Sequence, residues 1–186
     1  MNPTSNKSDF EDLTTNLKDL AYSYLEKYNP SKQQLKIYLL KKYLTKIKGT
    51  KSKKEVTSII NEIVTNLEKN KILSDELYSD SKARMYLRRG YSLNKINQSL
   101  RSKGIDEKFV KQSLEKIKEN QIEPDFVSAL KLCKRRRIGP VRPENNRELF
   151  YKKDMGILAR GGFSFDLSKR VLELDVKEFN KLIKII

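Results

Sequence analysis

Apolar residues recur at spacings of three and four along almost the whole sequence, which is the pattern of amphipathic helices. No stretch shows the alternation of apolar and polar residues that is typical of a half-buried strand. Prolines and glycines separate the periodic stretches. We therefore predict an all-α chain. Four of the expected helices cover 11–28, 32–48, 74–89 and 145–160. Further helices are expected to begin after Ser52, Ser92, Asp106 and Ser164, and at Pro124. The last of them can continue to Ile186.

A short motif marks the ends of several expected helices: a basic residue, a glycine, an apolar residue and a small polar residue. It reads Arg-Gly-Tyr-Ser at 89–92, Lys-Gly-Ile-Asp at 103–106 and Arg-Gly-Gly-Phe-Ser at 160–164. Glycine accepts the positive φ that often ends a helix, and Ser or Asp caps the next one. The recurrence predicts stacked helical repeats. We expect a disordered segment over 1–10 and three-helix repeats over 11–72, 73–121 and 122–186.

Composition favours a thin, shared core and an anionic partner. Only 37% of the residues are hydrophobic and 34% are charged, against roughly 45–50% and 25% in an average domain. The net charge of +16 would attract polyanions or an acidic protein surface. The sequence has no histidine and one cysteine, Cys133, which lies on an apolar helix face and is expected in the core. We expect no enzyme activity, cofactor or metal, and, without a long apolar run, a cytoplasmic protein with no membrane contact.

Two groups of basic residues are candidates for binding the anionic partner. Arg84, Arg88 and Arg89 lie near the end of one helix, and they are arginines in a chain that mostly uses lysine. The planar guanidinium group suits both carboxylates and phosphates. The second group is the densest and comprises Lys131, Lys134, Arg135, Arg136, Arg137 and Arg142.

Both groups also have a structural interpretation. The first fits basic residues in the last turn of a helix, which complement its dipole, and the second fits a solvated helix end. That interpretation is weaker for the second group, since adjacent cations repel one another unless an anion lies nearby. Lys103 and Arg160 stand at repeat junctions, where a dipole role and a partner contact are equally open. The pattern does not distinguish a phosphate from a carboxylate partner.

The middle of the chain resembles the central repeat of the RecX family of regulatory proteins. The resemblance lies in Ser-Lys-Ala-Arg-Met-Tyr-Leu-Arg-Arg-Gly-Tyr-Ser at 81–92, in Lys-Gly-Ile-Asp at 103–106, and in Ile-Leu-Ser-Asp at 72–75. The last repeat is similar in its basic cluster and in 158–164. The resemblance implies an elongated, curved array of three three-helix repeats without a catalytic centre or cofactor.

The same resemblance implies a partner, the filament that the RecA recombinase forms on single-stranded DNA, which such a protein inhibits or destabilises. It would act as a monomer in recombination and DNA repair, with or without touching the DNA itself. Two alternatives remain: a helix-turn-helix-like module that binds nucleic acid independently of RecA, and a helical scaffold for an acidic protein.

Overall fold

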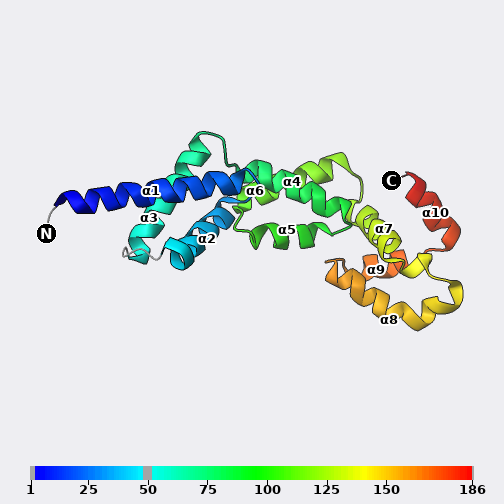
Figure 1. Cartoon of the computed structure of the whole chain (residues 1–186). Helices are drawn as coiled ribbons and strands as arrows, with labels where there is room; N and C mark the ends of the chain where they lie inside the picture. Colours follow the sequence, from blue (N-terminus) through cyan, green and yellow to red (C-terminus); the bar gives the residue numbers. More distant parts are fainter. Residues whose placement is uncertain (1–2, 48–51, 186) are drawn as a thin grey trace. The chain divides into compact units, whose positions relative to one another are not determined.

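The computed structural model describes residues 3–47 and 52–185, and within them it contains helices and no strand. Figure 1 shows the order of these helices. The all-α prediction is confirmed. The α-helices are α1 (Pro3–Leu25), α2 (Lys32–Lys42), α3 (Lys53–Lys69), α4 (Asp75–Arg88), α5 (Leu93–Arg101), α6 (Glu107–Asn120), α7 (Pro124–Arg136), α8 (Glu144–Arg160), α9 (Phe165–Leu172) and α10 (Val176–Ile185). A π-helical turn, η1 (Tyr43–Ile47), follows α2, and a 3-10 turn, η2 (Gly139–Val141), precedes α8.

The helices differ most from the expected ones at three places, while other boundaries shift by one to three residues. The first helix begins at Pro3, so residues 3–10 are helical where disorder was expected. The second helix changes into η1 at Tyr43, and its expected end at 48 lies outside the described residues. The last helix does not run on from Ser164: Asp175 separates α9 from α10, because its carboxylate accepts the backbone N–H of Glu178 at 2.8 Å and caps a new helix.

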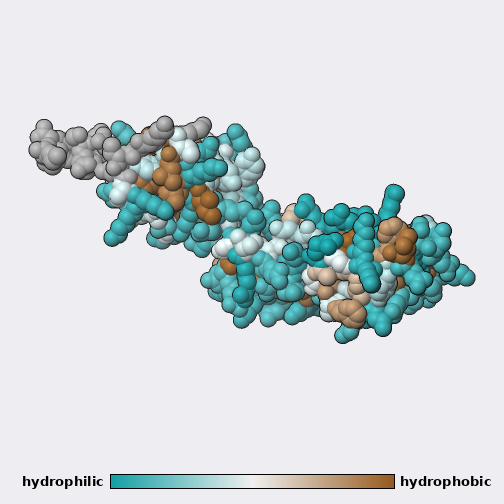
Figure 2. Space-filling model, turned by 90° about the horizontal axis from the view of Figure 1, so that it is seen from below, coloured by the Kyte–Doolittle hydropathy of each residue, from teal (hydrophilic) through white to brown (hydrophobic). Residues whose placement is uncertain are grey.

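The chain divides into two compact units, and the division falls inside α4. Unit 1 consists of Met1–Tyr78 with Lys103–Ile105, and unit 2 of Ser79–Ser102 with Asp106–Ile186. The three-repeat division remains a prediction beside this grouping. The surface in Figure 2 is mainly hydrophilic, with separate apolar patches, as expected for thin helical layers.

In unit 1, helices α1, α2 and α3 pack around one apolar core. Their inward faces meet in a cluster that includes Leu17, Leu35, Leu39, Val56, Ile60 and Val64. Ser31 and Ser52 begin α2 and α3 with the expected capping boxes, in which Gln34 and Glu55 return hydrogen bonds to the cap residues.

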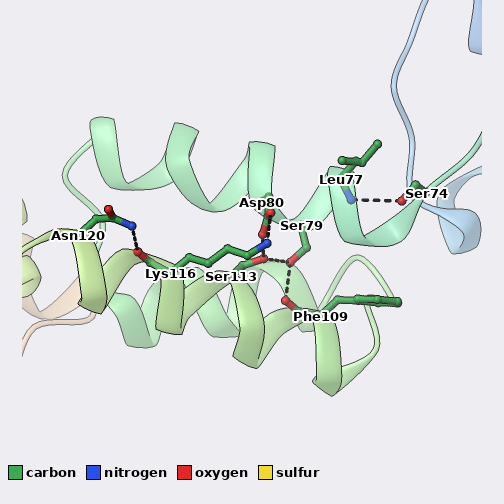
Figure 3. A network of polar contacts seen from close by, with 8 residues as sticks. All are labelled: Ser74, Leu77, Ser79, Asp80, Phe109, Ser113, Lys116 and Asn120. Carbon is green, nitrogen blue, oxygen red and sulfur yellow. Dashed lines mark hydrogen bonds and ion pairs between the residues drawn. The ribbon is translucent and has the colours of Figure 1, made fainter.

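In unit 2, α7, α8, α9 and α10 share a second core, which includes Leu130, Cys133, Ile138, Leu158, Val171 and Phe179. Helices α4 and α6 are joined by polar contacts (Figure 3). The Ser113 hydroxyl oxygen lies 2.6 Å from Asp80 Oδ1 and 2.8 Å from Ser79 Oγ, and the Ser79 hydroxyl donates to the Phe109 carbonyl. These contacts satisfy hydroxyl groups that the packing of α4 on α6 removes from water.

The start of a repeat's second helix is capped in each unit by a later part of the chain. In unit 1, Asp75 Oδ1 accepts the N–H of Lys32 at 2.8 Å, and the Ser31 hydroxyl donates to the Lys103 carbonyl at 2.7 Å. Burial raises the pKa of Asp75, against the lowering effect of that hydrogen bond and of the Lys32 charge. The side chain of Gln33 leaves no room for a Cβ at Gly104, whose φ is +73° as expected.

Unit 2 repeats this arrangement one repeat later. Asp125 Oδ1 accepts the N–H of Leu93 at 2.7 Å, and the N–H of Ser92 donates to the Gly161 carbonyl at 3.2 Å. Gly162, with φ +88°, lies against Ser92 Oγ. The Asp contacts are the same in both units, while the cap serine donates through its hydroxyl in unit 1 and through its backbone N–H in unit 2. These matching positions support the interpretation of the chain as tandem helical repeats.

Candidate partner-binding surface

The end of α4 places two of the candidate arginines in solvent. Arg88 is the last helical residue and Arg89 follows it, and both side chains are exposed. Gly90, with φ +72°, then turns the chain against α7: a Cβ there would lie 2.8 Å from the Leu132 nitrogen and 2.8 Å from the Ser128 carbonyl oxygen. Close contact of Gly90 with the α7 backbone therefore fixes the arginine-bearing end of α4 beside α7.

The last turn of α7 carries the densest basic group. Lys134, Arg135 and Arg136 are exposed, and Lys131, one turn earlier, is half-buried. Arg137 ends the helix in the left-handed conformation, with φ 54°, while the N–H of Ile138 donates to the Cys133 carbonyl. This position corresponds to Gly90 at the end of α4, but a bulky basic residue occupies it.

We predict that Arg137→Gly stabilises the protein by about 1 kcal/mol. A residue with a side chain costs roughly 1–2 kcal/mol in the left-handed region, and glycine avoids this cost. Part of the gain is offset because glycine loses more backbone entropy on folding. Urea unfolding followed by circular dichroism measures the change. Arg136→Gly, one residue inside the helix, is the matched control and should be destabilising by roughly 1 kcal/mol. A loss of stability in Arg137→Gly would contradict the assigned conformation.

Arg142 differs from the other candidates because its guanidinium is already bound to a carboxylate of the same chain. Its Nε and Nη2 donate to the two carboxylate oxygens of Asp154 at 2.7 and 2.8 Å, and its guanidinium lies 4.5 Å from the centre of the Phe150 ring. The hydrogen bonds with Asp154 raise the pKa of Arg142. These contacts are those of a structural residue, so we leave Arg142 out of the contact set that we propose below.

Two structural residues of this region were missed in the sequence. Asp154, only 1% exposed, also accepts the N–H of Gly139 at 2.9 Å, and Arg147 Nη2 donates to the Pro140 carbonyl at 2.6 Å. Together they hold η2 against α8. Asp154 had a recognisable signal: it lies three residues after Tyr151 and four before Leu158, on the face expected to be apolar.

The junction residues are placed less uniformly than expected. In unit 1, the Lys103 carbonyl accepts a hydrogen bond from the Ser31 hydroxyl. In unit 2, the Arg160 side chain is exposed in the last turn of α8. The positive φ values of Gly104 and Gly162 align Lys103 with Gly161, so Lys103 and Arg160 are not strictly equivalent. The structure therefore gives no reason to assign Lys103 and Arg160 the same contact with a partner.

Arg84 and Lys131, by contrast, come together: Arg84 on α4 and Lys131 on α7 line one cavity of unit 2. Arg88 and Arg89 directly precede Gly90, which packs on α7, so the basic residues of α4 and α7 lie on two helices that are in direct contact.

The remaining chemistry of the described residues is limited. Cys133 is fully buried in the core as expected, and burial, helped by the Asp154 charge, raises the pKa of its thiol to about 12. Residues 3–47 and 52–185 contain no group of three His, Cys, Asp or Glu arranged to hold a metal ion. No helix within the same ranges has the length and apolar character needed to cross a bilayer.

Comparison with known proteins gives a consistent result. The family model for the second three-helix domain of RecX matches residues 74–114, which contain α4, α5 and part of α6. The regulatory protein RecX of Myxococcus xanthus is 32% identical over 161 residues, covering 86% of this chain and 85% of that protein. RecX of Agrobacterium fabrum is 26% identical over 113 residues, covering 61% and 58% of the two chains.

Two crystal structures share the fold. RecX from Lactobacillus salivarius superposes with a TM-score of 0.61 at 17% identity, covering 92% of this chain and 99% of that one. A second structure of regulatory protein RecX gives a TM-score of 0.62 at 21% identity, covering 94% and 79%. On the extent and identity of the match to the Myxococcus protein, together with the central-repeat model, this chain belongs to the RecX family of regulatory proteins.

Proposed function

We propose that this protein binds the filament of RecA on single-stranded DNA and inhibits or destabilises it, and so restrains recombination and repair. The observation that supports the proposal is that exposed basic side chains end both α4 and α7, two helices in direct contact at Gly90, in a chain of this family. An extended anionic assembly suits a protein built of tandem helical repeats. The contact set comprises Arg84, Arg88, Arg89, Lys131, Lys134, Arg135, Arg136 and Arg137, with Lys103 and Arg160 as further candidates.

A second function, binding of nucleic acid without a recombinase, is favoured by the net charge of +16 alone. Affinity for bare single-stranded DNA and for the same DNA coated with RecA distinguishes the two. We expect tighter binding to the coated DNA. Equal or tighter binding to bare DNA, with a logarithmic salt slope of about −4 if about six phosphates of the single strand are contacted, would favour the independent nucleic-acid module.

Reversal of charge at the end of α7 tests the contact set. We predict that changing Arg135, Arg136 and Arg137 together to Glu weakens filament binding roughly tenfold or more, because charge-assisted hydrogen bonds contribute about 1.5–3 kcal/mol each. Helix content by circular dichroism should stay unchanged, since all three side chains are exposed. Reversal of Lys152, Lys177 and Lys181, also exposed in unit 2, changes the net charge equally. Equal losses in the two triple variants would show that only the overall charge matters.

A further inference from the structure

A cavity of about 550 Å³ opens in unit 2 between α4, α6, α7 and the end of α10. Its size is typical of sites that accept a small ligand or a few side chains of a partner. The residues that carry the argument are Arg84, Leu87, Lys116, Ile117, Val127 and Lys131.

One wall of the cavity is an ion pair between α4 and α6 (Figure 3). Lys116 Nζ lies 2.5 Å from Asp80 Oδ2, and Ser113 hydrogen-bonds the other carboxylate oxygen. Burial alone would raise the pKa of Asp80, but the hydrogen bonds from Lys116 and Ser113 and the charges of Lys116 and Arg84 together lower it. Asp80 is therefore ionised at neutral pH and largely balances the charge of Lys116.

Arg84 and Lys131 are not balanced in this way. Within the described part of the chain, neither side chain makes a hydrogen bond or an ion pair with another residue. They approach the cavity from two different helices, and Lys131 is half-buried. Asp80 also lines the cavity and feels the charge of Arg84, but it is one carboxylate among three cations, so the lining has a net positive charge and suits an anionic group.

The rest of the lining is apolar. Leu87, Ile117 and Val127 line the cavity, and Ile185 of α10 lies at it with 76% of its surface exposed. A sugar-phosphate backbone would use the two cations but would gain nothing from this apolar wall. A peptide that carries a carboxylate next to a large apolar side chain would use both.

We propose that this cavity binds an acidic peptide segment of a protein partner, with a carboxylate held by Arg84 and Lys131 and a neighbouring Leu or Phe packed on Leu87, Ile117 and Val127. This proposal rests on the proposed function, because it takes Arg84 and Lys131 to be contacts with the same partner. It assigns this part of the basic surface to protein and not to DNA.

The test is fluorescence anisotropy of the full chain with a fluorescein-labelled peptide, Asp-Glu-Leu-Phe-Asp-Glu. We expect saturable binding that weakens at least tenfold in the double variant Arg84→Gln with Lys131→Gln. The matched control, Lys152→Gln with Lys177→Gln, removes the same charge at exposed residues of unit 2 that neither line the cavity nor belong to the contact set, and it should change the affinity less than twofold. The peptide Asp-Glu-Ser-Ser-Asp-Glu should bind at least fivefold more weakly than the apolar one.

Three results would overturn the proposal: no saturable binding of the apolar peptide, equal losses in the two double variants, or a loss of labelled oligothymidylate binding in the Arg84/Lys131 variant while peptide binding persists. The last result would make the cavity a nucleic-acid site. Measuring filament binding as well distinguishes a failure of the cavity assignment from a failure of the proposed function. Retained filament binding by the wild-type chain without peptide binding would overturn the cavity assignment alone, and peptide binding without filament binding would overturn the proposed function alone.

Discussion

Replacing Gly90 with alanine is expected to destabilise unit 2 by about 2–5 kcal/mol. The left-handed backbone conformation at φ +72° costs a residue with a side chain roughly 1–2 kcal/mol. The new methyl group would in addition lie 2.8 Å from two backbone atoms of α7, which cannot rotate away as a flexible side chain would. Overpacking of this kind costs about 1–3 kcal/mol. Urea unfolding monitored by circular dichroism would show the loss as a lower midpoint.

Gly156→Ala is the matched control for this experiment. Gly156 lies inside α8, and a Cβ added there would meet the Arg160 guanidinium at 3.5 Å, an ordinary contact distance to the end of a flexible side chain. Alanine should therefore stabilise the helix by about 1 kcal/mol. If Gly90→Ala unfolds at the wild-type midpoint, the close contact between the end of α4 and α7 is wrong, and with it the argument that brings the two basic groups together.

Replacing Asp154 with alanine is expected to cost about 2–4 kcal/mol of unfolding free energy. Removal of one partner from a buried ion pair typically costs about 3–5 kcal/mol. The side chain of Arg142 is 20% exposed, so its freed charge can reach water and the loss should be somewhat smaller. The buried N–H of Gly139 would still lose its acceptor, at a cost of about 1–3 kcal/mol.

A double-mutant cycle isolates the pair. Arg142→Ala and the double variant should give a coupling energy above about 1 kcal/mol, as expected for residues in direct contact. The control is Glu173→Ala, which breaks an exposed pair with Lys169 at 3.9 Å and should change stability by less than about 0.5 kcal/mol. Additive effects of Asp154 and Arg142 would return Arg142 to the candidate contact set.

Local signals in the sequence predicted most of the helices because their causes are local. Ser31, Ser52, Ser92 and Ser164 cap helices as expected, since a capping hydroxyl reaches only the next turn. The break before α10 has a local cause too, in the side chain of Asp175, but the regular apolar spacing across it concealed the cap.

The site could be predicted only in part, because it depends on contacts between residues far apart in the sequence. The basic ends of α4 and α7 could be recognised in the sequence, but the packing of the end of α4 on α7 could not, because the close contact at Gly90 joins residues far apart in sequence. Arg142 carries the same charge as the other basic residues of its group, and only its ion pair with Asp154 distinguishes it from them. The cavity between α4 and α7 likewise depends on tertiary packing that periodicity does not reveal.

The central claim, that this basic helical protein restrains a RecA filament, is tested most directly by the rate of ATP turnover by RecA assembled on single-stranded DNA. Addition of the purified full chain at stoichiometric concentration should slow turnover, and the Arg135, Arg136 and Arg137 charge-reversal variant should slow it much less. Unchanged turnover with the wild-type protein, under conditions where it remains folded by circular dichroism, would contradict the account.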